Sequence, residues 1–439
     1  MPDAPSVDFA PRSRALYERA CRVMPGGNTR TTVFYDPFPL YLVQGAGCRV
    51  TDADGRVYLD VINNFTAMIH GHAHPAVTAA AAAQIARGTA FGAPTPAEIE
   101  LAELLVDRIA SVEQIRFTNS GTEAVMTAVK AARAFTGRSR ILKIEGAYHG
   151  SYDLVEVSLD TPPERWTSPA PSVAYVRGTP QSMLDEVIVV PMNDLAAART
   201  AFALYGETIA AVLIDPMPNR AGLVPAGMAF LDGLATLAHA HGALTVLDEV
   251  ITLRLGHGGA QGRLGLRPDL TAMGKIIGGG FAVGALGGRA DVMAVFDPRG
   301  RRPVLPHGGT FSANPVTMSA GLAAMTLLTP ESFARLDVMG ERVKAAVNAS
   351  FMRTGLPGRC VGCGSLLKVH FSAEAGDDYR GAYADPTARA RLAAFHRGLL
   401  ERGVMIAAYG LMALSTPMTD ADIDILIEAV DATLTAIAD

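Results

Sequence analysis

Short apolar runs rich in β-branched residues alternate along this chain with alanine-rich stretches of helical periodicity, and this alternation limits the folds open to it. Repeated strand-helix-strand units give a mostly parallel sheet covered by helices. Ile209–Ile214 and Leu244–Leu247 are predicted as buried strands, with Leu231–Ala240 as the crossover helix between them. We therefore predict an α/β fold in which loops at the carboxyl ends of the strands converge on one crevice.

Two helix starts carry clear signals. Thr95-Pro96-Ala97-Glu98 combines an N-cap, a first-turn proline and a capping glutamate, and the apolar residues that follow are Ile99, Leu101, Leu104 and Leu105. Thr419 and Asp422 open a C-terminal helix whose apolar positions share one face. The order of elements predicts a small domain formed by residues 1–75 and 326–439, and a large domain over residues 76–325.

Composition excludes several classes of partner. The formal net charge of −5, with 18% charged residues, provides no basic field for nucleic acid. The N-terminus lacks the basic and apolar regions of a signal peptide, and no apolar run of about 18 residues occurs, so a cytoplasmic protein without membrane contact is expected. Cys360 and Cys363 form the one close cysteine pair, whereas a zinc site needs a second pair at similar spacing, so no metal site is predicted.

The stretch most informative about chemistry is Leu244-Thr-Val-Leu-Asp248, followed 27 residues later by Lys275 beside small residues and glycines. A strand that ends in Asp248 delivers a carboxylate to the crevice, and Lys275 can reach the same place from the next strand. Pyridoxal 5′-phosphate (PLP) needs such a pair, because an amine forms the Schiff base and a buried carboxylate keeps the ring nitrogen protonated. Spacing alone leaves open a loop-capping aspartate and an ordinary surface lysine.

A second motif, Asn119-Ser120-Gly121-Thr122-Glu123, runs into a helical pattern. Free N–H groups at a helix N-terminus, with hydroxyls beside them and a glycine that permits close approach, form a phosphate cradle. The alternative is a plain helix cap. Tyr148, in Gly146-Ala-Tyr-His-Gly150, could lie flat on a planar cofactor, and Thr310, in a glycine-rich turn, could donate to a phosphate.

Together and in this order, these motifs resemble the class III aminotransferases of PLP fold type I, over nearly the whole chain. Gly71-His-Ala-His-Pro75 and Asn119-Ser-Gly-Thr-Glu123 are similar to the glutamate-1-semialdehyde aminomutase subgroup. Phe65-Thr-Ala-Met-Ile-His-Gly71 and Asp248-Glu-Val-Ile-Thr-Leu-Arg254 look closer to the β-amino acid (β-phenylalanine) aminotransferases. The resemblance implies a large domain with a mostly parallel sheet between helices and a smaller α+β domain from the two termini.

The resemblance also implies roles for individual residues. Ser120, Gly121 and Thr122 would hold the phosphate, Tyr148 would stack on the ring, and Val250 would pack on its other face. Asp215, which would also bind the cofactor, stands where the family more often has glutamate. Thr310 would reach the phosphate of the neighbouring subunit of a homodimer with shared active sites. Arg30 matches a position that receives a substrate carboxylate, and Phe65 belongs to the substrate pocket.

One departure concerns the acceptor. Tyr409 stands where the β-phenylalanine enzymes carry an arginine that binds a dicarboxylic acceptor, which implies that 2-oxoglutarate is a poor acceptor and makes pyruvate or another keto compound a candidate. The function implied is transfer of an amino group from an amine or β-amino acid to a keto acid, through a Lys275 Schiff base and ping-pong half-reactions. The alternative is an aminomutase-type isomerase, which the sequence does not separate from it.

Overall fold

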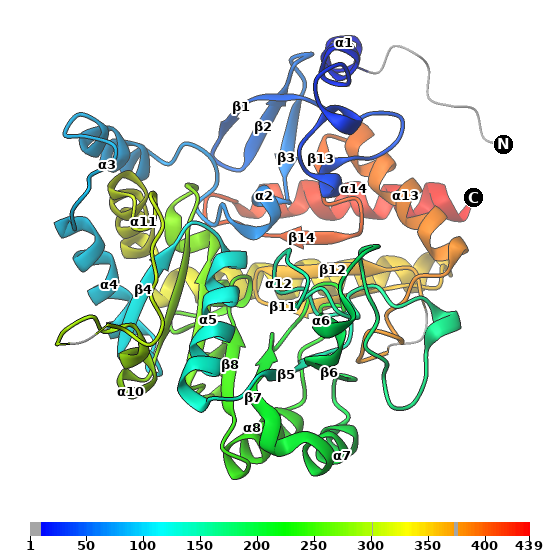
Figure 1. Ribbon diagram of the computed structural model, residues 1–439. Helices are drawn as coiled ribbons and strands as arrows, with labels where there is room; N and C mark the ends of the chain where they lie inside the picture. The colour runs from blue at the N-terminus through cyan, green and yellow to red at the C-terminus, as the bar shows by residue number, and fades with distance from the viewer. Residues whose placement is uncertain (1–9, 301, 373–375) are drawn as a thin grey trace. The chain divides into compact units, whose positions relative to one another are not determined.

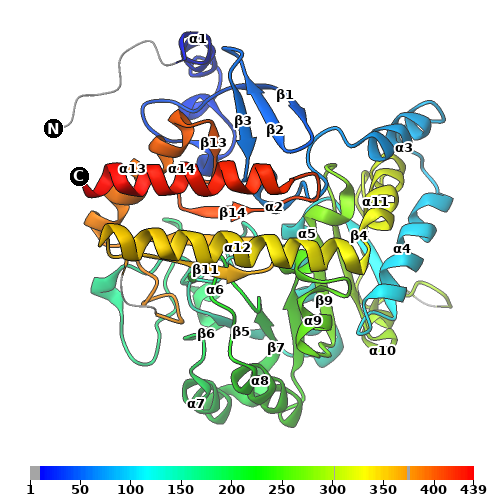
Figure 2. The same cartoon turned by 180° about the vertical axis from the view of Figure 1, so that it is seen from behind.

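The computed structural model describes residues 10–300, 302–372 and 376–439, which form two compact units. The larger unit holds residues 75–335 together with a short segment, 376–383, from late in the chain. The smaller unit holds residues 10–74, 336–372 and 384–439. Figures 1 and 2 show the elements of both units from opposite sides.

A seven-stranded sheet forms the centre of the larger unit, in the order β4-β10-β9-β8-β7-β5-β6. Strands β9, β8, β7, β5 and β6 run parallel, whereas β10 is antiparallel to both of its neighbours, β4 and β9. The strands are β4 (Gln114–Thr118), β5 (Arg140–Ile144), β6 (Val187–Val190), β7 (Ile209–Ile214), β8 (Leu244–Asp248), β9 (Leu270–Gly274) and β10 (Gly284–Gly288). The strands predicted at 209–214 and 244–247 are confirmed.

Helices cover both faces of this sheet. Along β7, Ala211 and Leu213 pack on the face of α5, and Val212 and Ile214 pack on the face of α7 and α8, as the twofold alternation of a strand requires. The helices of the unit are α3 (Pro75–Ile85), α4 (Pro96–Arg108), α5 (Gly121–Thr136), α6 (Gln181–Asp185), α7 (Leu195–Tyr205), α8 (Met228–Ala240), α9 (Gly259–Leu264), α10 (Ala290–Met293) and α11 (Pro315–Leu327).

Helix α4 departs from the sequence prediction at its start. It begins at Pro96 as expected, but the Thr95 side chain makes no capping hydrogen bond. Ile99 is 56% exposed, whereas Leu101 and Leu105 are fully buried. Position 99 is therefore not on the buried face that Leu101 and Leu105 share.

The smaller unit contains two sheets. One has the order β1-β2-β3-β13 and the other is the antiparallel set β11-β12-β14. The strands are β1 (Leu42–Ala46), β2 (Arg49–Asp52), β3 (Val57–Asp60), β11 (Arg359–Cys363), β12 (Leu366–His370), β13 (Val404–Met405) and β14 (Leu411–Ala413). The helices are α1 (Pro11–Ala20), α2 (Asn63–Thr66), most of α12 (Pro330–Thr354), α13 (Pro386–Glu401) and α14 (Asp420–Ala438).

Helix α14 has the predicted capping box, in which the Thr419 hydroxyl accepts from the Asp422 N–H and the Asp422 carboxylate accepts from Thr419. It runs beside α12 (Figure 2). The Asp431 carboxylate of α14 accepts hydrogen bonds from the Ser350 hydroxyl and the Arg353 guanidinium of α12. No helix among the described residues is long and apolar enough to cross a bilayer.

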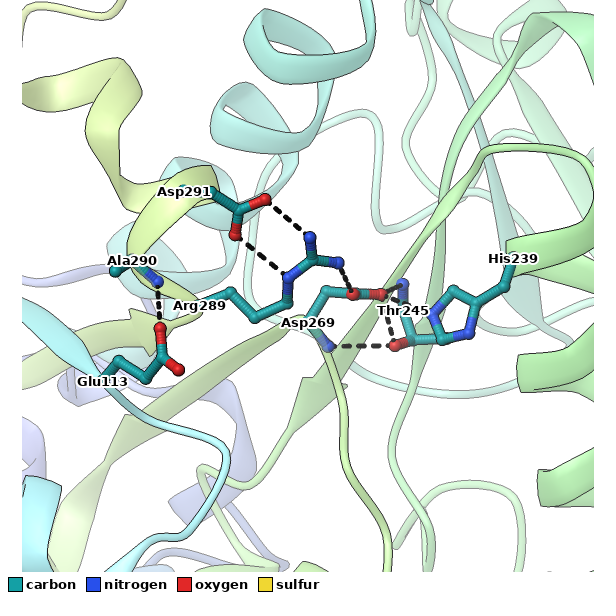
Figure 3. A network of polar contacts seen from close by, with 7 residues as sticks. All are labelled: Glu113, His239, Thr245, Asp269, Arg289, Ala290 and Asp291. Atoms are coloured by element: carbon teal, nitrogen blue, oxygen red, sulfur yellow. Dashed lines mark hydrogen bonds and ion pairs between the residues drawn. The ribbon is translucent and has the colours of Figure 1, made fainter.

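At the amino ends of β8 and β9, a buried carboxylate ties several elements together (Figure 3). Asp269 accepts hydrogen bonds from the Thr245 N–H (2.7 Å), the Thr245 hydroxyl (2.8 Å) and Arg289 Nη1 (2.6 Å), and lies 2.8 Å from His239 Nε2. Burial raises the pKa of Asp269, but these hydrogen bonds outweigh burial, so the pKa lies below its ordinary value. The charged form therefore stabilises this edge.

Replacing Asp269 by Asn should lower the free energy of unfolding at pH 7 by about 2–4 kcal/mol, because buried donors lose a charged acceptor. Because the folded-state pKa of Asp269 lies below its unfolded-state pKa, the stabilisation is fully present at pH values above the unfolded-state pKa. It is lost as the pH falls through the folded-state pKa. The difference between wild type and D269N in urea unfolding should therefore shrink below about pH 4.

Asp291 offers a matched control, since it pairs with the same Arg289 but its side chain is 55% exposed, against 3% for Asp269. D291N should cost less than about 1 kcal/mol. Equal losses in the two variants would show that burial of Asp269 contributes nothing.

Candidate functional site

The carboxyl ends of six strands, all but β10, lie at one edge of the seven-stranded sheet. Because β4 and β9 are both antiparallel to β10, they point the same way, and Thr118, Gly284 and Gly274 lie in register. Ile214 pairs with Leu247, so Asp215 and Asp248 follow at the same level. The predicted residues Ser120, Tyr148, Asp215, Asp248 and Lys275 all follow or end one of these strands.

The turn after β4 opens helix α5. Ser120 is its N-cap, and its hydroxyl accepts from the Glu123 N–H at 3.2 Å. The N–H groups of Gly121 and Thr122 have no acceptor recorded among the described residues. Capping and anion binding are therefore compatible here, since one hydroxyl serves the helix while two N–H groups and the start of a 16-residue helix stay available to an anion.

Gly121 is required for close packing. A Cβ at this position would lie 2.8 and 2.9 Å from the two methyl carbons of Val250, and one at Gly274 would lie 3.5 Å from Val250 and 3.6 Å from Gly121. Gly121 in the turn after β4, Val250 shortly after β8 and Gly274 at the end of β9 thus meet at one point.

Asp248 is held by two neighbours. Its Oδ1 accepts from the Val250 N–H at 3.0 Å, and its Oδ2 lies 2.8 Å from Nδ1 of His149. The His149 side chain is fully buried, and burial lowers the pKa of His149 although Asp248 opposes the shift. A neutral ring that donates from Nδ1 leaves Nε2 as an acceptor, and no partner of Nε2 occurs in the described part of the chain.

His149 is the site residue that the sequence reasoning missed. The Gly146–Gly150 motif was of interest for Tyr148 alone, and a histidine 99 positions before an aspartate gives no signal of contact. His149 lies five residues after the end of β5, at the same edge of the sheet as Asp248, and this shared edge is the hint that the sequence offers.

Lys275 follows β9 directly and has a φ of +50°, an uncommon conformation for a residue other than glycine. Burial lowers the pKa of Lys275 to about 8, opposed by the negative charges of Asp248 and Asp215 and assisted by the positive charge of Arg254. At pH 7 about one tenth of this amine is therefore unprotonated, far more than of an ordinary lysine.

Two more buried carboxyl groups surround this arrangement. Burial and the repulsion of Asp248 raise the pKa of Asp215 well above its ordinary range, and its Oδ1 accepts from the Met217 N–H at 2.8 Å. Burial also raises the pKa of Glu249 to about 7, although the N–H groups of Ala260 and Gln261 each donate to it at 2.8 Å. Of these three carboxyl groups, Asp248 is the one that contacts a histidine among the described residues.

The loop that carries Tyr148 and His149 is fastened by the segment 376–383. Arg380 donates to both carboxylate oxygens of Glu145, at 2.8 and 3.1 Å, and Glu145 is 1% exposed. Gly146 has a φ of +72°, and a Cβ there would lie 2.1 Å from the ring of Tyr379. Tyr148 itself is 43% exposed, so part of its side chain is accessible to a ligand.

Thr310 lies in the loop before α11 and is exposed, with no hydrogen bond to Ser120, Gly121 or Thr122 recorded. Within one chain, Thr310 makes no hydrogen bond to the Ser120–Thr122 turn. The predicted role of Thr310 at the phosphate of a neighbouring subunit therefore stays a prediction.

The three predicted substrate residues gather in the smaller unit. The Arg30 guanidinium lies 5.6 Å from the centre of the Phe65 ring, and the Phe65 and Tyr409 rings stack with centroids 6.3 Å apart and planes inclined by 22°. Lys368 Nζ lies 5.6 Å from the centre of the Tyr409 ring. The result is an aromatic pair with a cation over each ring.

The family model described as aminotransferase class III matches residues 31–434. This chain belongs to the class III aminotransferases. A β-phenylalanine transaminase of Variovorax paradoxus is 39% identical, covering 97% of this chain and 93% of its own, and a glutamate-1-semialdehyde 2,1-aminomutase of Sorangium cellulosum is 40% identical, covering 91% and 90%. The crystal structure of an omega-transaminase from Sphaerobacter thermophilus has a TM-score of 0.95 and 48% identity, covering 98% of both chains.

The enzyme is thus a PLP-dependent aminotransferase of fold type I, and the predicted fold class, family and cofactor are confirmed. Its own residues fit the cofactor. A buried amine of lowered pKa, a carboxylate fixed by two donors and a helix N-terminus with available N–H groups meet at one edge of the sheet. These match the aldehyde, the ring nitrogen and the phosphate of PLP.

Gly121→Ala should lower the free energy of unfolding by about 1–3 kcal/mol, because its Cβ overlaps both methyl groups of Val250. The double variant G121A/V250A should recover most of the loss, since the second change removes the methyl groups that clash. Urea unfolding of both variants and of V250A alone measures this coupling. Additive effects of the two changes would contradict the steric account.

Proposed function

We propose that this aminotransferase takes the amino group of a β-amino acid or amine and delivers it to a keto acid in ping-pong half-reactions. The observation that carries the proposal is the meeting of Lys275, the Asp248–His149 pair and the Ser120–Thr122 turn at one edge of the sheet. When bound, PLP links to Lys275 Nζ and withdraws electrons from the donor's amine-bearing carbon.

Each residue then has a defined task. Ser120, Gly121 and Thr122 would hold the phosphate, Tyr148 and Val250 would pack on the ring, and Asp248 with Asp215 would hold the ring nitrogen. Asp248 holds a proton at the ring nitrogen, and His149 and the Val250 N–H keep that carboxylate oriented. Lys275 Nζ takes the proton from the amine-bearing carbon, a role for which a pKa of about 8 is suited.

In the smaller unit, we propose that Arg30 receives the donor carboxylate and that Phe65 and Tyr409 bound the substrate pocket. A tyrosine at position 409 gives no bidentate site for a second carboxylate, so pyruvate is the preferred acceptor over 2-oxoglutarate. The working unit would be a cytoplasmic homodimer, with Thr310 reaching the neighbour's phosphate.

The lowered pKa of Lys275 can be tested directly with the apoenzyme. Covalent capture of PLP, trapped by borohydride and located by peptide mass spectrometry, should rise with pH around a midpoint near 8, because only the unprotonated amine reacts. The exposed Lys130 serves as internal control, and K275R should trap nothing at this site. A midpoint near 10.5 would overturn the proposed role of burial.

The substrates can be tested with the holoenzyme and a matched panel: 3-amino-3-phenylpropanoate, L-alanine and 1-phenylethylamine as donors, each with pyruvate or 2-oxoglutarate. The β-amino acid with pyruvate should give the highest kcat/KM. Arg30→Met should lower kcat/KM for the β-amino acid by about 10–100-fold, the worth of a charge-assisted pair. Tyr409→Arg should improve 2-oxoglutarate relative to pyruvate.

The second candidate function is an aminomutase, favoured by relatives such as the 41% identical glutamate-1-semialdehyde 2,1-aminomutase of Desulforudis audaxviator. An aminomutase converts its substrate without a separate keto acid. Isomerisation of glutamate 1-semialdehyde in the absence of any acceptor, with no turnover of the donor panel, would overturn the transaminase proposal.

A further inference from the structure

The short helix α2 is left-handed. Its four residues, Asn63, Asn64, Phe65 and Thr66, all have positive φ, of 50°, 47°, 53° and 79°. None of them is glycine. Left-handed residues other than glycine occur singly, most often as asparagine, and a run of four that includes an aromatic and a β-branched residue is strongly disfavoured. Such a conformation persists only where the surroundings impose it.

The surroundings impose it through Asn63, which is fully buried. Its Nδ2 donates to the Ala413 carbonyl at 2.5 Å, and its N–H donates to Asp60 Oδ1 at 2.9 Å. Asp60 Oδ1 also accepts from the Ile62 N–H at 2.8 Å, and its Oδ2 lies 2.7 Å from Nε2 of His72. Thr66 is 1% exposed, so both ends of the turn are fixed from inside.

Because the ends are buried, the turn presents its two middle residues outward. Asn64 is exposed, and its Oδ1 accepts from Arg30 Nη1 at 2.8 Å. The same guanidinium lies over the ring of Phe65, the other middle residue. No ion pair of Arg30 with a carboxylate is found in residues 10–300, 302–372 and 376–439. The turn therefore orients this cation without neutralising it.

A second local structure orients Arg30 from its own backbone. Asn28 Oδ1 accepts from the Arg30 N–H at 2.9 Å, and Asn28 Nδ2 donates to the Gly26 carbonyl at 3.1 Å. An exposed arginine ordinarily samples many rotamers, and this entropy is lost when it binds a carboxylate. Here a backbone turn, an amide and an aromatic face restrict it beforehand.

We propose that Asn64 is a positioning residue, held by the left-handed turn so that the Arg30 guanidinium is preorganised for the carboxylate of the amino donor. This rests on the proposed function, in which Arg30 receives that carboxylate. The site would accordingly discriminate between β-amino acid donors, whose carboxylate is one methylene away from the amine-bearing carbon, and simple amines that lack a carboxylate, with Asn64 contributing only to the former.

Asn64→Gly is the most informative variant, because glycine adopts φ of 47° without strain while the amide is removed. The ratio of kcat/KM for 3-amino-3-phenylpropanoate to that for 1-phenylethylamine should fall about tenfold, mainly through KM of the β-amino acid. The melting temperature of N64G should equal that of the wild type. If Asn64 had a purely structural role, the melting temperature would fall.

Asn64→Asp keeps the acceptor oxygen but adds a charge that pairs with Arg30. It should reduce the same ratio at least as much as N64G, because a paired guanidinium attracts a substrate carboxylate less. Addition of salt should partly restore the ratio in N64D and not in N64G, since screening weakens the added pair.

Arg30→Met separates this inference from the proposed function. If R30M lowers the ratio and N64G leaves it unchanged, Arg30 binds the carboxylate without help from Asn64 and the positioning role is wrong. If R30M itself leaves the ratio unchanged, the proposed role of Arg30 fails. A fall in both variants, with melting temperatures equal to wild type, supports the two together.

Discussion

Strand β10 runs against both of its neighbours, and this single reversal decides where the chemistry of the larger unit collects. It allows β4 to point in the same direction as β9, so the helix N-terminus that follows β4 and the lysine that follows β9 arise at one edge. A parallel β10 would send its own carboxyl end into that space. The antiparallel strand instead begins there, with Gly284, where any side chain would overlap the Ser120 carbonyl.

The same edge concentrates groups that water would normally solvate. Asp215, Glu249 and Lys275 all have pKa values displaced towards the neutral form, with burial as the largest cause in each case. At the opposite edge, the buried Asp269 has a pKa displaced towards the charged form, because donors surround it. The sheet thus carries a stabilising carboxylate at one end and groups poised to exchange protons at the other.

Strand ends and helix caps were predictable because they depend on local sequence. The β8 strand ending in Asp248, the Ser120 turn and the Thr419 capping box follow from apolar periodicity and capping residues over a few positions. The prediction was wrong for the Thr95 side-chain cap, and the exposure of Ile99 could not be read from the sequence because it depends on tertiary packing. His149 and the left-handed turn at Asn63–Thr66 could not be foreseen, since their contacts join positions 99 and 350 residues apart.

The segment 376–383 makes the larger unit discontinuous along the chain. Tyr379 occupies the space above Gly146, and Arg380 neutralises the buried Glu145. A fragment comprising residues 75–335 alone would contain the whole sheet, yet it would have a hole beside the loop that carries Tyr148 and His149 and a buried carboxylate without its cation. The larger unit is therefore not a module that can be excised or exchanged among relatives as one stretch of sequence, and chimeras must carry this late segment with it.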